Sequence, residues 1–473
     1  MFMKFGIKAF WLAIAVIAVS GTNAALAQGM DSGTKGMGMP PRPMLQDIRV
    51  APTVSSTPDD SNPLVKKTGS SQPTAVRANS YDPVLADVAI PGYTGILVET
   101  LDGKTVVESA STSAFNPASN VKLATAFAVL KTFGPDYRFP TNVWTDGTID
   151  HSTGTLTGNV YVSGRDPIFG YEHAVAIANA LNRLGVRSVT GDLIVTDNFA
   201  MNYSNSAAHA SEALISTLDS SRRSAAATRV WLNYLANSGM ASQVTDTPSV
   251  AFTGHVYVQP IPSSLKLLFS HESAPMREII KATLCYSNNF LAERLGDMLG
   301  GAYAVARVVQ LNAGVSASDF SLQTSSGLGI NRVTPASMMK LLRSLRAELA
   351  RNRMTFADIM PVAGVDKGTL ENRFDTDFSK GSVVGKTGTL GNTDGGVSSL
   401  AGEISTKNGK LLFIVFNQHG SVARFRAFQN SYISLIQGQF GGAVPMVYDA
   451  VPLDVRLARS RIVRGSVLTA RSE

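Results

Sequence analysis

Short apolar stretches separated by glycine-containing turns occur near both ends of the chain. Asp102-Gly103 and Asn408-Gly409 are dipeptides that favour a tight turn between two strands. The stretches that flank them are residues 95–100, 105–108, 397–405 and 411–416. The sequence therefore predicts one β-hairpin near the start of the ordered chain and a second near its end.

Apolar positions recur at helical spacing between these hairpins and after the second one. Asn116 is a suitable N-cap and Pro117 suits the first helical position, while Gly185 suits a helix end. The expected helices are residues 117–130, 173–184, 275–284, 290–299 and 422–436. Strands that open and close the chain, with helices between them, predict an α+β fold in which helices cover an antiparallel sheet.

The pattern changes between residues 140 and 265, where short strands and loops alternate. Strand-like stretches at 156–162 and 191–196 flank the helix expected at 173–184. We interpret 140–265 as an inserted, mostly-β domain. The main domain is then formed by residues 81–139 and 266–445.

Both termini have a composition unlike that of the core. Lys4 and Lys8 form a basic start that precedes an apolar run at 9–19. Ala25-Leu26-Ala27 then offers a small-residue cleavage site, so residues 1–27 are predicted to be a signal peptide. The run is shorter than the roughly 20 residues that span a bilayer. Residues 28–80, rich in Gly, Pro, Ser and Met, predict a disordered linker, with ordered structure from about Gly92. Residues 446–473 predict a mobile basic tail. We expect a periplasmic protein with no transmembrane span after cleavage.

Composition restricts the classes of partner. The 473 residues carry a formal net charge of +7, which suits weak association with an anionic cell envelope. No basic stripe interleaved with aromatic residues occurs, so we expect no nucleic-acid partner. Cys285 is the only cysteine, which excludes an intramolecular disulfide and predicts a buried, inert thiol. No feature of the sequence specifies an oligomeric state.

Ser119 and Lys122 lie three residues apart at a predicted helix start, so they share one face. A serine hydroxyl becomes a nucleophile when a base takes its proton, and a neutral lysine amine can do so. Because the ordinary pKa of lysine is about 10.4, Lys122 must be desolvated or lie beside another cation, for which Lys386 is the candidate. An ordinary helix start with a solvated lysine would show the same two residues.

Two further motifs follow in order. Ser287-Asn288-Asn289 lies between two predicted helices, where it is compatible with an N-cap or with a proton relay at Ser287 and substrate positioning by Asn289. Lys386-Thr387-Gly388 predicts a strand whose glycine permits close approach and whose lysine supplies charge for a substrate carboxylate. The order SxxK, SxN, KTG is the signature set of penicillin-binding proteins and serine β-lactamases.

Other catalytic patterns are absent from the sequence. Residues 381–387 resemble a P-loop but have three residues between the glycines instead of four. No GxSxG elbow and no HExxH zinc motif occurs. We therefore expect no nucleotide, no metal ion and no cofactor.

Together these residues resemble D-alanyl-D-alanine carboxypeptidase/endopeptidases of the penicillin-binding protein 4 type, the class C low-molecular-mass group. The resemblance extends over roughly residues 85–440. It is also carried by Gly158–Gly164 with Asp166-Pro167, Ser325–Leu328 with Arg332–Pro335, Pro361–Asp366, Gly368–Leu370 with Arg373, and Gly385–Leu390. It implies a β-lactamase/DD-peptidase-like fold, peptidoglycan peptides as substrates and β-lactam antibiotics as inhibitors.

The resemblance also implies a role for each motif residue. Ser119 attacks the carbonyl of the penultimate D-Ala, with Lys122 as general base. Ser287 passes the proton to the departing amine, and Asn289 positions the substrate. Lys386 engages the terminal carboxylate beside Thr387 and Gly388, and the N–H groups of Ser119 and Thr389 form the oxyanion hole.

The chain departs from the family pattern in three ways, one of which is an inserted region shorter than that of larger members. Cys285-Tyr286 precede Ser287 where the family usually has a lysine, and Thr324 stands where an aspartate usually begins the Ser325 segment. These changes put the balance between carboxypeptidase and endopeptidase activity in doubt. The alternative functions are a β-lactamase, a catalytically idle peptidoglycan-binding scaffold and an SxxK esterase. No ExxLN motif lies between the second and third motifs to support the first alternative.

Overall fold

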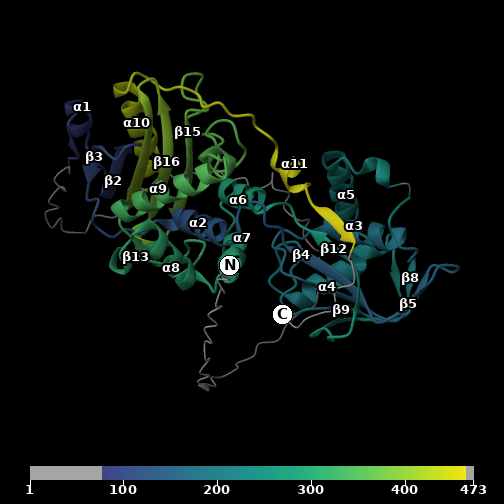
Figure 1. The fold of residues 1–473 in the computed structure, drawn as a ribbon. Coiled ribbons are helices and arrows are strands. Elements are labelled where there is room, and N and C mark those ends of the chain that lie inside the picture. Colours follow the sequence, from purple (N-terminus) through teal and green to yellow (C-terminus); the bar gives the residue numbers. More distant parts are fainter. Residues whose placement is uncertain (1–76, 245, 465–473) are drawn as a thin grey trace, which may run out of the picture. The chain divides into compact units, whose positions relative to one another are not determined.

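The computed structural model describes residues 77–244 and 246–464 (Figure 1). The predicted signal peptide, residues 28–76 of the predicted linker and residues 465–473 lie outside the described residues. We expected ordered structure from about Gly92, but it begins earlier in the chain. Strand β1 (Asn79–Ser80) pairs with β3, and helix α1 (Pro83–Ala86) is capped by the Asp82 side chain, which accepts from the Val84 N–H at 2.9 Å.

The main sheet has six strands in the order β1-β3-β2-β17-β16-β15, all paired antiparallel. Both predicted hairpins are confirmed, and Gly103 and Gly409 adopt the positive φ that their turns require. The remaining strands are β2 (Tyr93–Thr100), β3 (Thr105–Ser109), β15 (Val383–Leu390), β16 (Val397–Thr406) and β17 (Gly409–Gln418).

Apolar residues point to both faces of this sheet because each face is covered by helices. Along β17, Leu412, Ile414 and Phe416 belong to one core, whereas Leu411 and Phe413 belong to another. Helix α10 (Val422–Gln439) contributes to the second core. The helices of the first core are α2 (Val121–Phe133), α6 (Met276–Cys285), α7 (Asn289–Asp297), α8 (Ala302–Ala313) and α9 (Pro335–Arg351). The α+β prediction is confirmed.

A separate core lies in the inserted region. It is formed by a six-stranded sheet in the order β11-β9-β7-β4-β12-β18 and by a four-stranded sheet in the order β10-β8-β6-β5. The strands are β4 (Pro140–Thr145), β5 (Thr148–Asp150), β6 (Thr155–Thr157), β7 (Val160–Gly164), β8 (Ser188–Val189), β9 (Leu193–Val195), β10 (Ala251–Phe252), β11 (Val256–Val258) and β12 (Lys266–Glu272). Three helices accompany them, α3 (Tyr171–Arg183), α4 (Ala207–Leu218) and α5 (Ala225–Ser238). We expected the inserted domain to end at residue 265. Since β12 pairs with β4, its sheet extends beyond that residue.

The expected mobile tail is wrong for its described part. After α10 the chain forms α11 (Leu453–Leu457) and β18 (Arg461–Arg464), and β18 pairs antiparallel with β12. The arginines that suggested a tail are engaged, since Arg461 lies 2.7 Å from Glu272. No helix in the part of the chain that the structure describes has both the length and the apolar character needed to cross a bilayer.

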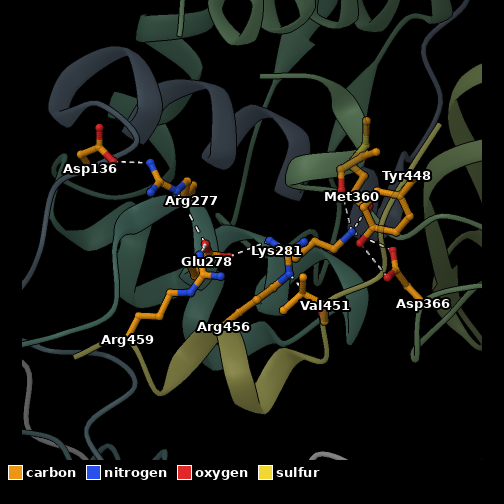
Figure 2. A network of polar contacts seen from close by, with 11 residues as sticks. Asp136, Arg277, Glu278, Lys281, Met360, Asp366, Tyr448, Val451, Arg456 and Arg459 are labelled. Carbon is orange, nitrogen blue, oxygen red and sulfur yellow. Dashed lines mark hydrogen bonds and ion pairs between the residues drawn. The ribbon is translucent and has the colours of Figure 1, made fainter. Parts of the chain in front are cut away.

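A buried polar network attaches this C-terminal segment to α6, the helix that leads to Ser287. Figure 2 shows the Glu278 carboxylate among three guanidinium groups; it accepts from Arg456 at 2.9 Å and from Arg459 at 3.0 Å. One turn further along, Lys281 donates to Asp366 at 2.7 Å. The Tyr448 hydroxyl donates to the same Asp366 carboxylate at 2.9 Å.

Lys281 also donates to two backbone carbonyls, those of Ala357 and Met360, at 2.8 and 2.7 Å. We expect Lys281→Met to remove about 3–5 kcal/mol of folding free energy, because it leaves the Asp366 carboxylate and both carbonyls buried without this donor. The measurement is the melting temperature against wild type. The control is Lys367→Met, which breaks an exposed pair with Glu371 worth at most about 1 kcal/mol. Equal effects of the two substitutions would contradict the prediction.

Candidate active site

Ser119 lies at the start of the helical segment that the sequence predicted. It belongs to a short 3-10 turn, Ala118–Asn120, that leads directly into α2. The Asn116 side chain accepts from the Ala118 N–H at 3.0 Å, and Ala118 adopts a positive φ. Residues 121–130 of α2 are all buried, so the helix holds the turn against the core while Ser119 remains half-buried and accessible.

The Lys122 amine is enclosed by three oxygens. Nζ of Lys122 lies 2.6 Å from the Ser326 carbonyl, 2.7 Å from Oδ1 of Asn289 and 3.0 Å from Oγ of Ser119. A neutral amine has two N–H donors and one lone pair. The carbonyl and the amide oxygen can each accept one N–H, which leaves the lone pair for the Ser119 hydroxyl.

Burial favours this neutral form. The Lys122 side chain is 1% exposed, and desolvation lowers its pKa to about 7, although the Glu293 carboxylate acts in the opposite direction. Of the two causes that the sequence left open, desolvation is the larger one for Lys122.

Sequence reasoning missed Glu293. Its two carboxylate oxygens accept from the N–H groups of Ser325 and Ser326 at 3.1 and 3.0 Å. This fixes the turn that supplies the Ser326 carbonyl to Lys122. Gly327 follows at positive φ, and a Cβ there would lie 2.0 Å from the Ala118 carbonyl oxygen. The Ser-Ser-Gly sequence was a visible signal, but the glutamate that holds it is not adjacent in the chain.

The N-cap interpretation of the second motif is confirmed. Asn288 caps α7, since its side chain accepts from the Leu291 N–H at 3.0 Å. Asn289 then faces Lys122, and Ser287 adopts a positive φ that a serine rarely takes. Oγ of Ser287 lies 2.8 Å from Nζ of Lys386, so the second and third motifs are in direct contact.

Strand β15 lies directly against the Ser119 turn. A Cβ on Gly388 would lie 2.7 Å from the Pro117 carbonyl oxygen and 2.9 Å from the Ser119 nitrogen, so only glycine allows this approach. Ser399 on the neighbouring strand donates to the Pro117 carbonyl at 2.7 Å. On β15 itself, Lys386 is fully buried and Thr389 is exposed.

A second polar cluster, also missed from the sequence, fixes two loops beside the Ser119 turn. Asp394, at positive φ, accepts from Asn116 at 2.7 Å and from both terminal nitrogens of Arg332 at 2.8 and 3.0 Å. Asn116 also donates to the Gly329 carbonyl at 2.9 Å. One carboxylate thus ties the loop after β15 to the segment before α9.

The one thiol of the chain is buried, as predicted. Cys285 is buried and unpaired with another cysteine, and burial raises its pKa to about 12. Burial therefore disfavours a thiolate at this position.

Comparison with models of protein families assigns the chain to a family. The model of the D-Ala-D-Ala carboxypeptidase 3 (S13) family matches residues 78–228 and 233–432. The chain belongs to this family. It is thus a serine-type D-Ala-D-Ala carboxypeptidase by family, as the motifs predicted. A D-alanyl-D-alanine carboxypeptidase of Actinomadura sp. (strain R39) is 26% identical over 444 residues, covering 72% of this chain and 81% of that relative.

Solved structures share the fold at lower identity. The predatory endopeptidase Bd3459 of Bdellovibrio bacteriovorus, in complex with an immunity protein, has a TM-score of 0.65 at 22% identity, over 79% of this chain and 100% of its own. Penicillin-binding protein 4 of Haemophilus influenzae has a TM-score of 0.55 at 20% identity, over 74% and 97%. These likenesses confirm the DD-peptidase-like fold that the sequence implied.

We expect the acylation rate of Ser119 to fall as the pH drops below about 7, the pKa of Lys122. Below its pKa the amine binds a proton and cannot accept one from Ser119, so the rate should decrease about tenfold per pH unit. The measurement is the pH profile of acylation by a β-lactam. A flat profile between pH 5 and 8 would show that Lys122 is not the base.

We expect Glu293→Gln to move the fall in acylation rate on the acidic side of the pH profile (the acidic limb) to lower pH. The substitution removes the negative charge that raises the pKa of Lys122 but keeps an acceptor oxygen for one backbone N–H. Asp297→Asn on the same helix is the control and should leave the limb in place. A limb that moves to higher pH in Glu293→Gln would contradict the assignment.

Proposed function

We propose that the protein releases D-Ala from peptidoglycan stem peptides through an acyl-enzyme on Ser119. The observation that carries this proposal is the Lys122 amine, whose lone pair is left for the Ser119 hydroxyl by two carbonyl-type acceptors. In the first step the Ser119 proton moves to Lys122 while Oγ bonds to the carbonyl carbon of the penultimate D-Ala. The N–H groups of Ser119 and Thr389 stabilise the resulting oxyanion.

The leaving amine then needs a proton. The proton that Lys122 took from Ser119 goes to this amine through the Ser287 hydroxyl, which contacts Lys386 at 2.8 Å. Lys122 is then neutral again before deacylation. The carbon–nitrogen bond breaks, free D-Ala departs, and the acyl group remains on Ser119 until water hydrolyses the ester. Since Oδ1 of Asn289 accepts from Lys122, the NH₂ group of this amide is the part that can position the substrate.

Two further properties follow from similarity. Bd3459 has been solved in its penicillin G-acylated form, and the Haemophilus protein in complex with a β-lactam. We propose that β-lactams likewise acylate Ser119 here. The name of Bd3459 supports a second activity, the endopeptidase cleavage of peptidoglycan cross-links.

We propose that the protein acts in the periplasm, with weak association to the anionic envelope. The basic start, apolar run and small-residue site within residues 1–27 support export, as does a substrate that lies outside the cytoplasmic membrane. Fractionation of cells with an antibody to the folded domain tests this, and a cytoplasmic pool alone would contradict it.

We expect wild-type protein to form a stable adduct with a fluorescent penicillin and to release D-Ala from a D-Ala-D-Ala peptide. Ser119→Ala should form no adduct and lose about 10³-fold or more of its activity, because it lacks the nucleophile. An unchanged melting temperature is the control for folding. D-Ala release retained by Ser119→Ala would exclude the mechanism.

The same experiment separates the alternatives. Rapid consumption of the antibiotic without a lasting adduct would indicate a β-lactamase. Absence of both adduct and consumption would indicate an idle scaffold. Cleavage of short acyl esters in place of the peptide would indicate an SxxK esterase.

A further inference from the structure

The turn that carries Ser119 has a strained backbone. Ala118 adopts a φ of 46°, a conformation that an alanine rarely takes. Its N–H donates to Oδ1 of Asn116 at 3.0 Å, which closes the turn just before the nucleophile. The next N–H in the chain belongs to Ser119 and is one of the two oxyanion-hole donors of the proposed mechanism. The direction of this N–H therefore depends on how the Asn116 amide is held.

The Asn116 amide can take two orientations, because its oxygen and its NH₂ group have nearly the same shape. In the observed orientation the NH₂ group donates to Oδ2 of Asp394 at 2.7 Å and to the Gly329 carbonyl at 2.9 Å. A carbonyl and an ionised carboxylate only accept hydrogen bonds. In the flipped orientation the amide oxygen would face these two acceptors, and the NH₂ group would face the Ala118 N–H. The two acceptors thus select the orientation that keeps the turn closed.

Asp394 keeps the negative charge that this selection requires. Arg332 donates to both carboxylate oxygens, at 2.8 and 3.0 Å, in the bidentate geometry of strong ion pairs. Burial opposes the charge, but the hydrogen bonds from Arg332 and Asn116 lower the pKa of Asp394 below its ordinary value. The carboxylate is therefore ionised at neutral pH and cannot donate a hydrogen bond to Asn116.

The loop of Asp394 follows the strand that supplies the second oxyanion donor. Thr389 lies near the end of β15, and Asp394 comes five residues later, at a φ of 49°. Its carbonyl accepts from the His419 N–H at 3.1 Å, which ties the loop to the end of β17. The backbone of Asp394 is thus fixed to the main sheet, while its carboxylate reaches the Ser119 turn.

We propose that Asp394 is a positioning residue, which sets the direction of the Ser119 N–H in the oxyanion hole through the Asn116 amide. The inference rests on the proposed acyl-enzyme mechanism, in which this N–H stabilises the charge that develops on the carbonyl oxygen. Because that charge forms in the transition state, a misaligned donor lowers kcat and leaves KM nearly unchanged. Asp394 acts on the turn and not on the base, so the acidic limb of the pH profile stays in place.

The first test measures kcat, KM and the pH profile of D-Ala release for Asp394→Asn. With its oxygen on Arg332, the new amide turns its NH₂ group toward that of Asn116 and favours the flipped orientation. We expect kcat to fall about 10- to 100-fold, less than the roughly 10²–10³ for removal of a donor. KM should change less than about threefold, and the acidic limb should not move.

Glu99→Gln is the matched control. It also removes a carboxylate that accepts from two nitrogens of one arginine, Nε and Nη2 of Arg343. This variant should leave kcat, KM and the acidic limb unchanged. A fall in kcat as large as that of Asp394→Asn would overturn the inference, because loss of any such ion pair would then suffice.

A swap of the two side chains tests the orientation argument directly. In the double variant Asn116→Asp with Asp394→Asn, one carboxylate oxygen at position 116 can accept from the Ala118 N–H and the other from the amide at position 394. We expect kcat to recover at least about threefold relative to Asp394→Asn. A double variant as slow as Asp394→Asn would overturn the inference.

Amide hydrogen exchange of residues 115–119, measured by mass spectrometry, tests the inference without turnover. Faster exchange in Asp394→Asn than in wild type and Glu99→Gln supports it, even if the wild type releases no D-Ala and the proposed function fails. Unchanged exchange or unchanged kcat would overturn it. A raised KM at constant kcat would overturn it in favour of substrate binding by Asp394, and a displaced acidic limb in favour of an effect on Lys122.

Discussion

The active site depends on the desolvation of one amine. Lys122 lies in a helix whose residues 121–130 are all buried, so a proton on its amine is costly. Its N–H groups are still satisfied, because Asn289 and the Ser326 carbonyl accept them. A lysine that pointed to solvent would keep its proton near neutral pH and could not serve Ser119. In the proposed mechanism the apolar character of α2 is therefore required as much as the lysine itself.

Three segments that are far apart in the sequence meet around Ser119 and Lys122. Each of them is held by a different contact. Glu293 holds the turn that carries Ser326. Gly388 lets β15 approach the Ser119 turn to a distance that no other residue allows. The third segment, after α6, is anchored by the buried Glu278 and Lys281 network, which ties α6 to the C-terminal segment (Figure 2). Catalytic geometry here rests on buried polar contacts between segments that are far apart in sequence.

The sequence predicted those parts of the fold, such as tight turns and helix caps, that depend on residues adjacent in the chain. Asp102-Gly103 and Asn408-Gly409 specify their turns whatever surrounds them, and Asn288 caps α7. The N-cap predicted at Asn116 was wrong, because Pro117 takes the cap position of the 3-10 turn, and the Asn116 side-chain oxygen instead accepts from Ala118, which has a positive φ. The pairing of β18 with β12 was not predictable in this way, because four residues rich in arginine form a strand only when a partner edge exists. The contacts of Glu293 and Asp394 were not predictable for the same reason, since each joins segments that lie far apart in the sequence.

The lysine and arginine side chains near Ser119 differ in how easily each loses its charge. Lysine sheds its proton when buried, so Lys122 and Lys386, both enclosed, are suited to proton transfer with the hydroxyls of Ser119 and Ser287. Arginine keeps its charge, and Arg426 remains exposed beside Thr389. A motif of the KTG type cannot show this difference, because burial of its lysine is a property of the assembled sheet.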